Sequence, residues 1–144
     1  MENRLKYFIY PEYNLVIEFL AGNIGLEDYI NLKRTEIADP RYKPTYNHVI
    51  DIRKSNILNS DVSLKGDLNL NAENYARFIS ATPELSAKRK SAFITITSEQ
   101  VVATILYKSL NLLPMEMEVF STVEAALKWL GNVDFDPDLY HPEQ

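Results

Sequence analysis

The sequence has 144 residues, 46% of them hydrophobic, and a formal charge of -5 at pH 7. A chain of this length buries one sizeable core and is too short for two ordinary domains. It contains no cysteine, which excludes a disulfide framework, thiolate metal sites and a cysteine nucleophile. We expect a single-domain cytoplasmic protein.

The charge balance and hydropathy exclude two classes of partner. A net negative chain is poorly suited to nucleic acid, whose binding depends on clustered lysine and arginine. The one dense basic run, Lys88 to Lys90, is interpreted as a solvated helix end before a buried strand. No stretch approaches the roughly 20 apolar residues that span a bilayer, so we expect no membrane insertion.

The first part of the chain predicts a hairpin and then a helix. Residues 6–10 and 15–20 are rich in aromatic and branched side chains, and the residues between them have a turn composition. They predict an antiparallel hairpin. Four apolar residues at helical spacing then predict a helix that Pro40 ends: Leu26, Tyr29, Ile30 and Ile37.

Residues 48–52 form a short apolar run that is typical of an inner strand in a largely parallel sheet. Asp51 lies within this run, where an ionised carboxylate needs a hydrogen-bonding partner. Arg53 is two residues further, hence on the same face of the strand, and is the expected partner. We interpret Asp51 as a structural carboxylate. The polar segment after Arg53 favours turns and helix caps.

A second helix is predicted from near Asn71, with Tyr75, Phe78 and Ile79 as its apolar stripe. Residues 91–97 are the strongest strand pattern in the chain. Thr97 and Gln100 then match a capping box, in which the glutamine side chain reaches back to the helix cap. The helix that follows has five apolar residues that we assign to its inner side: Val101, Val102, Ile105, Leu106 and Leu110.

The last part of the chain predicts an edge strand, a helix and a tail. Residues 116–120 alternate acidic and apolar side chains. Ser121 and Glu124 match a second capping box, and Gly131 suits the left-handed residue that ends the helix. The acidic segment 132–144 is expected to be frayed, or laid on the surface through Phe135, Leu139 and Tyr140.

The alternation of strands and helices places the chain in the α/β class. We expect one domain over residues 1–131, with a mixed sheet of about five strands, an N-terminal hairpin and about four packed helices. Such sheets bind ligands where strand carboxyl ends meet helix N-termini. That edge collects residues 51–61, residues 97–100 and residues 121–122.

No pattern in the sequence indicates an enzyme. His48 and His141 show no metal-ligand spacing, and no G-x-S-x-G elbow nominates a serine nucleophile. The four glycines form neither a dinucleotide nor a phosphate-loop fingerprint. We therefore expect no metal, no cofactor and no catalytic residues.

Three segments carry a resemblance to a known family: YNHVIDIR, SAFITIT followed by a capped helix, and FSTVEAALKWLG. Over roughly residues 4 to 131 the chain resembles the SpoIIAA-like proteins of the STAS group. These are related to anti-sigma-factor antagonists and loosely to CRAL-TRIO lipid carriers. The resemblance implies a STAS-like fold and a non-enzymatic domain that acts by binding.

The resemblance also implies a regulatory loop. In sporulation-type STAS domains an acidic strand end is followed by an Asp-Ser-Ser segment whose last serine is phosphorylated. Counting from Asp51, the matching segment is Asn59, Ser60 and Asp61, so a carboxylate stands at the phosphorylated position. A kinase cannot switch a carboxylate, and the loop is therefore expected to be a fixed acidic one.

Two functions remain open from the sequence, ahead of a distant third, an enzyme that uses Asp51 or Asp61. The first is a regulatory or protein-interaction module that uses residues 55–65 and the adjoining helix. The second is a carrier of a small apolar ligand between the second helix and the sheet, against Tyr75, Phe78 and Ile79. A homodimer is also predicted, because an edge strand and many aromatic residues are compatible with one.

Overall fold

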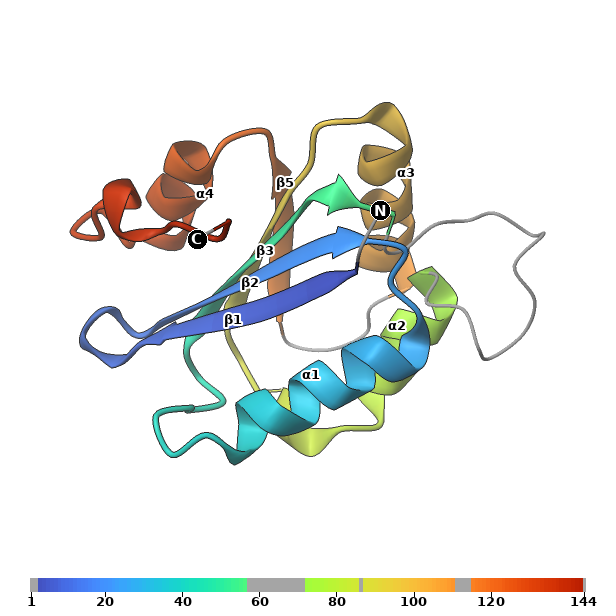
Figure 1. Cartoon of the computed structure of the whole chain (residues 1–144), viewed down its shortest axis with the longest axis horizontal. Coiled ribbons are helices and arrows are strands. Elements are labelled where there is room, and N and C mark those ends of the chain that lie inside the picture. Colours follow the sequence, from blue (N-terminus) through green and yellow to red (C-terminus); the bar gives the residue numbers. More distant parts are fainter. Residues whose placement is uncertain (1–2, 57–71, 86, 111–114, 144) are drawn as a thin grey trace.

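Figure 1 shows the computed structural model, which describes residues 3–56, 72–85, 87–110 and 115–143. Its single sheet has the order β1-β2-β3-β4-β5. The strands are β1 (Arg4–Tyr10), β2 (Leu15–Gly22), β3 (Asn47–Ser55), β4 (Lys90–Ile94) and β5 (Glu116–Phe120). β1 runs antiparallel to β2, and the other neighbouring strands pair parallel. The predicted mixed sheet with an N-terminal hairpin is confirmed.

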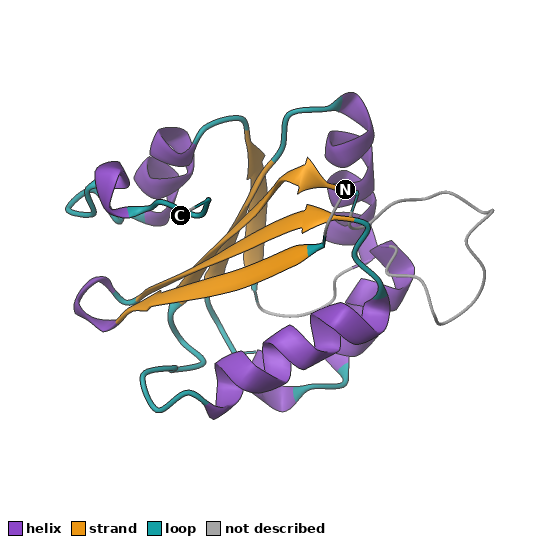
Figure 2. Cartoon of the chain, viewed as in Figure 1, coloured by secondary structure: helices purple, strands orange, loops and turns teal. Residues whose placement is uncertain are grey.

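The α-helices of the described residues are α1 (Leu26–Ala38), α2 (Ala72–Ser80), α3 (Ser98–Leu110) and α4 (Val123–Leu130). α1, α2 and α3 cover one face of the sheet, and α4 covers the other together with the C-terminal segment (Figure 2). Because side chains alternate along a strand, Leu20 and Ile50 face the first group of helices, whereas Ile17 and Val49 face α4. The protein therefore has two hydrophobic cores, one on each face of the sheet.

Two strand ends differ from the sequence prediction. β3 continues past Ile52 to Ser55, because its last residues pair with the end of β2, where Ser55 lies opposite Gly22. β4 stops at Ile94, and Thr97 instead becomes the residue before α3. The carboxyl ends of β2 and β3 therefore extend beyond the end of β4.

The N-cap of the C-terminal helix lies one residue later than predicted. Thr122 caps α4, since its side-chain oxygen accepts a hydrogen bond from the Ala125 amide at 3.1 Å, and Ser121 lies outside the helix. Gly131 ends α4 with φ of 82°, as the sequence predicts. In the segment that follows, Phe135 and Tyr140 pack into the core on the α4 side, whereas Leu139 is 49% exposed.

The predicted inner side of α3 is wrong. Its buried residues are Gln100, Ala103, Thr104 and Tyr107. Four of the five residues assigned to the core are exposed instead: Val102 (63%), Ile105 (54%), Leu106 (43%) and Leu110 (42%). We call these four residues the α3 stripe. The basic run was also misassigned in part, because Arg89 is buried.

Candidate functional site

An open cavity of about 1040 Å³ lies at the carboxyl edge of the sheet, beside the start of α3. Its walls come from the start of β1, the ends of β2 and β3, and the first turns of α3. The lining residues are Arg4, Gly22, Asn23, Arg53, Lys54, Ser55, Asn56, Thr97, Ser98, Glu99, Gln100, Val102 and Ala103. This is the edge at which parallel sheets generally bind ligands, and we call it the carboxyl-edge cavity.

The side chain of Gln100 joins α3 to the end of β3. Its amide nitrogen donates to the backbone carbonyls of Ile52 at 2.7 Å and Ser55 at 3.0 Å. Its amide oxygen accepts from the backbone amides of Ile96 and Thr97, at 2.7 and 3.1 Å. The bond from the Thr97 amide belongs to the capping box that the sequence predicts. The bonds to the carbonyls of β3 were not predicted, and they fix which side of α3 faces the sheet.

The remaining inward residues of α3 continue this attachment. The Thr104 hydroxyl donates to the Gln100 carbonyl at 2.8 Å, which satisfies a buried polar group within the helix. The Tyr107 ring lies 4.4 Å from the Tyr75 ring and 5.8 Å from the Phe93 ring, centroid to centroid. These aromatic contacts hold α3 between α2 and the sheet, and they leave the α3 stripe on the outside.

The charged residues that line the carboxyl-edge cavity are mostly basic. Arg4 lies with its guanidinium carbon 5.6 Å from the centre of the Phe19 ring. Arg53 binds Asp51 through two nitrogens, each at 2.9 Å. Lys54 pairs with Glu143, and both of these side chains are about half exposed. Glu99 is the one acidic residue among the described lining residues.

Asp51 is a buried structural carboxylate, and the predicted pairing with Arg53 is present. Its Oδ2 atom also accepts a hydrogen bond from the Tyr140 hydroxyl at 2.8 Å. Burial, followed by the Asp51 charge, raises the pKa of Tyr140, which therefore stays a neutral donor. Asp51 thus holds the C-terminal segment over the sheet, beside a smaller cavity of about 490 Å³ that shares Arg53 and Lys54 with the first.

The other predicted site residues lie elsewhere. Asn59, Ser60 and Asp61 fall outside the described residues, so the regulatory loop stays a prediction. Tyr75 and Ile79 are buried in the core between α2 and the sheet, and Phe78 is half-buried beside them. None of these three is among the described residues that line the two cavities.

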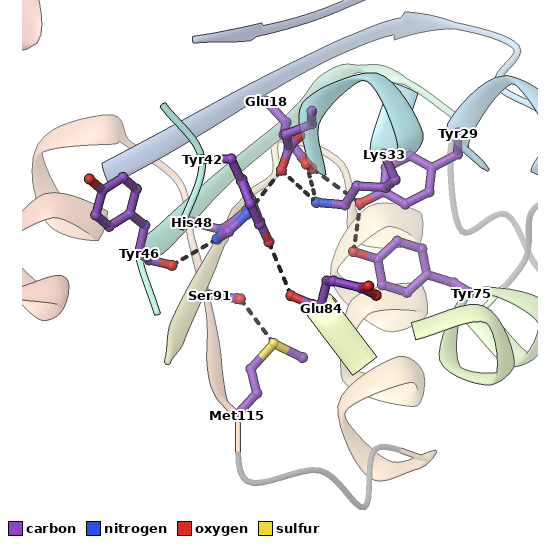
Figure 3. A network of polar contacts seen from close by, with 11 residues as sticks. Glu18, Tyr29, Lys33, Tyr42, Tyr46, His48, Tyr75, Glu84, Ser91 and Met115 are labelled. Atoms are coloured by element: carbon purple, nitrogen blue, oxygen red, sulfur yellow. Dashed lines mark hydrogen bonds and ion pairs between the residues drawn. The ribbon is translucent and has the colours of Figure 1, made fainter. Parts of the chain in front are cut away.

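A network of buried charged residues lies at the contact between α1 and the sheet (Figure 3). Lys33 binds both Glu18 and Glu36, the latter at 3.1 Å. Glu36 also contacts His48 at 3.1 Å between its Oε1 atom and the ring Nε2. Glu18 accepts a hydrogen bond from the Tyr29 hydroxyl, which in turn contacts the Tyr75 hydroxyl at 3.0 Å. The network therefore links β2, α1, β3 and α2.

Burial controls the protonation of this network. It raises the pKa of Glu18 to about 7, with a further increase from the Glu36 charge and a partial offset from Lys33. Burial alone would lower the pKa of Lys33, but the Glu18 and Glu36 carboxylates raise it above its usual value. Burial, Arg89 and Lys33 together hold the pKa of His48 well below its usual value. Lys33 is thus the cation, and His48 is neutral.

Glu18, Glu36 and His48 offer possible metal-ligand atoms that lie within 4.8 Å of one another. The Lys33 ammonium binds both carboxylates, so it supplies the positive charge that such a group requires. All four side chains are at most 2% exposed, which closes the network to a substrate from solution. We assign it a structural role, that of fixing α1 on the sheet.

The sequence interpretation did not identify Glu18, Lys33 or Glu36. Two signals for them were present. Glu18 interrupts an otherwise apolar strand, and Tyr29, Lys33 and Glu36 are spaced three or four residues apart on one helix face. Read together, a lone carboxylate in a buried strand and a polar row on the following helix predict a buried ion network.

Comparison with solved structures shows that the chain has a SpoIIAA-like fold, which confirms the resemblance that the sequence predicts. It is similar to the crystal structure of an uncharacterised protein of the DUF3478 family with a SpoIIAA-like fold, from Shewanella loihica PV-4. The TM-score is 0.59 at 19% sequence identity, over 90% of this chain and 96% of that chain. No protein-family model and no curated protein matches the chain.

No helix in the described part of the chain is long and apolar enough to cross a membrane.

Replacing Gln100 tests the attachment of α3. Gln100→Ala removes the bonds to β3 and to the helix cap, and it should lower the free energy of unfolding by about 2–4 kcal/mol. Gln100→Glu keeps the cap acceptor and loses the amide donor, so an intermediate loss is expected. Urea unfolding, followed by the fluorescence of the single tryptophan, Trp129, measures the unfolding free energy of both variants. A loss below about 1 kcal/mol for the alanine variant would show that this joint does not hold the helix.

Replacing Glu18 tests the buried network through pH. Because the folded-state pKa of Glu18, about 7, lies above its usual 4.5, its contribution is full below pH 4.5 and is lost as the pH rises through 7. Glu18→Gln lacks this titration. The unfolding free energy of the variant minus that of the wild type should therefore rise by roughly 3 kcal/mol between pH 4.5 and 7.5.

Burial lowers the pKa of His48 and the Glu18 charge opposes that effect, so Glu18→Gln also changes the titration of His48, and the difference reports on the two groups together. Glu99→Gln removes a carboxylate at an exposed position of α3 and is the matched control, against which the rise for Glu18→Gln is compared. A difference for Glu18→Gln that stays constant or falls with pH would refute the raised pKa.

Proposed function

We propose that this chain is a non-enzymatic, SpoIIAA-like binding domain that contacts a partner protein through its carboxyl edge and the α3 stripe. The proposed surface differs from the one expected from the sequence. It uses α3 in place of the second helix, whose apolar side chains Tyr75 and Ile79 are buried in the core.

The α3 stripe is the observation that carries this proposal. Four large aliphatic side chains, from 42% to 63% exposed, lie along one side of a single helix. Isolated exposed apolar residues are ordinary, but a contiguous row is typical of a protein contact. Ile96, in the loop before α3, is also 74% exposed and lines the smaller cavity. Each of these residues would gain free energy from burial against a partner.

The distribution of titratable groups supports a binding role over a catalytic one. Several groups with strongly perturbed pKa values, among them Glu18 and His48, belong to a network that solvent does not reach. The Asp51 carboxylate accepts hydrogen bonds from Arg53 and Tyr140. A general acid or base must instead lie within hydrogen-bond reach of a substrate.

Carriage of a small ligand is the second candidate, and the carboxyl-edge cavity favours it. Its volume of about 1040 Å³ is in the range that holds a small molecule. The ligand would lie between α3 and the ends of β2 and β3, and not beneath α2 as the sequence suggested. Native mass spectrometry of the purified protein separates the candidates, because a carrier retains a small molecule that adds a constant mass.

Photo-crosslinking tests the proposed contact surface. A benzophenone amino acid in place of Ile105 should crosslink a partner in extract of the native host. Val102→Asp in the same protein should reduce that product by about tenfold or more, since a charge is then desolvated in the contact. The matched control is Val133→Asp, at an exposed valine outside α3, which should leave the product unchanged. Equal crosslinking in the Val102 variant would contradict the proposal.

A further inference from the structure

Building on the proposed function, we propose that the α3 stripe and the carboxyl-edge cavity together bind an acidic amphipathic helix of the partner protein. Three features of this surface identify that class of occupant: the spacing of its apolar side chains, its continuity with the cavity, and the charge of the residues around it.

The spacing of the stripe matches a helix. Val102, Ile105 and Leu106 stand at positions i, i+3 and i+4, and Leu110 follows one turn later. The row is about 12 Å long, since a helix rises 1.5 Å per residue. A row of this kind on a convex helix surface leaves a small molecule exposed on its far side. An amphipathic helix lays its own apolar face along such a row and buries both.

The stripe continues into the carboxyl-edge cavity. Val102 belongs to both, and Ala103, the next residue, lines the cavity from the buried side of α3. One end of a bound helix can therefore insert a large apolar side chain into a concave site while the rest lies along the stripe. Contacts that combine a pocket with a surrounding apolar surface are those that carry most binding energy in protein interfaces.

The charge around the cavity selects an acidic occupant. Three of its four charged lining residues in the described structure are basic, although the whole chain has a net charge of -5. Arg53 is oriented by its two bonds to Asp51. The pair between Lys54 and Glu143 is about half exposed on both sides, so it contributes little and can exchange for a partner carboxylate.

A further basic residue, Lys108, lies towards the other end of the stripe. Lys108 bonds Glu118 at 2.8 Å, and both side chains are nearly half exposed. A bound acidic helix therefore meets lysine at both ends of its apolar contact. A second copy of this chain would instead bring the same basic cavity lining to the interface, and like charges across a contact are unfavourable.

Three labelled peptides of about 18 residues test the occupant directly. The first is amphipathic, with leucine at helical spacing and glutamate on its other faces. The second carries lysine in place of glutamate, and the third keeps the acidic composition with leucine positions scrambled. By fluorescence anisotropy, the first should bind the wild-type protein about tenfold or more tightly than either other peptide, and added salt should weaken it.

Single substitutions assign the binding to this surface. Val102→Asp and Ile105→Asp should each weaken the first peptide by about tenfold or more. Lys54→Glu should weaken the acidic peptide and strengthen the lysine peptide. Lys88→Glu makes the same charge change at an exposed position outside the cavity, and Val133→Asp the same apolar-to-acid change outside α3. Neither control should alter binding of the first peptide by more than about twofold.

The outcomes separate this inference from the proposed function. If no peptide binds, or the lysine peptide binds best, while Val102→Asp still abolishes the crosslinked partner, the acidic helix is overturned and the binding role stands. If the stripe variants alter neither measurement, both are overturned. A light-scattering mass of twice 16.6 kDa that Val102→Asp returns to the monomer value would assign the surface to a second copy, and would also overturn the inference.

Discussion

The buried amide of Gln100 determines how α3 lies on the sheet, and the exposed surface of the molecule follows from it. Its nitrogen satisfies carbonyls of β3 that extend beyond the end of β4, and its oxygen satisfies two amides at the start of α3. Leaving such groups unpaired in the interior costs about 1–3 kcal/mol each. No rotation of α3 that buries the stripe keeps these bonds, because Gln100 and Leu106 lie on different sides of the helix.

The second fixed point is the ion network beneath α1. Lys33 between two carboxylates satisfies the charges of both, and removal of one member of such a group leaves an uncompensated buried charge. Tyr29 and Tyr75 extend the network from α1 to α2. The layer of three helices is thus attached to the sheet by polar contacts at two places, and the exposed α3 stripe takes no part in this attachment.

Much of the fold could be predicted from the sequence because its signals are local. Strand composition, Pro40 after the first helix, and the capping pair of Thr97 and Gln100 all act within a few residues. The pairing of Asp51 with Arg53 follows from strand alternation. The partner Tyr140 could not be predicted, since it is separated from Asp51 by 89 residues.

The orientation of α3 was beyond sequence analysis for a different reason. Both the stripe and the buried set of Ala103, Thr104 and Tyr107 repeat at helical spacing, and hydropathy alone selects the more apolar one. The choice depends on the carbonyls at the end of β3, which become available only once the sheet has formed. The attachment of α3 fixes which positions face outwards but does not require apolar side chains there, so the apolar stripe is a positive sign of a contact surface.

Cysteine labelling tests the central claim, that α3 presents its apolar stripe to solvent. The chain has no cysteine, so single substitutions can be read without background. Val102→Cys and Leu106→Cys should react with maleimide nearly as fast as in the unfolded protein. Ala103→Cys and Thr104→Cys should be protected by about 100-fold or more. The opposite pattern, with positions 102 and 106 protected and positions 103 and 104 reactive, would contradict the account.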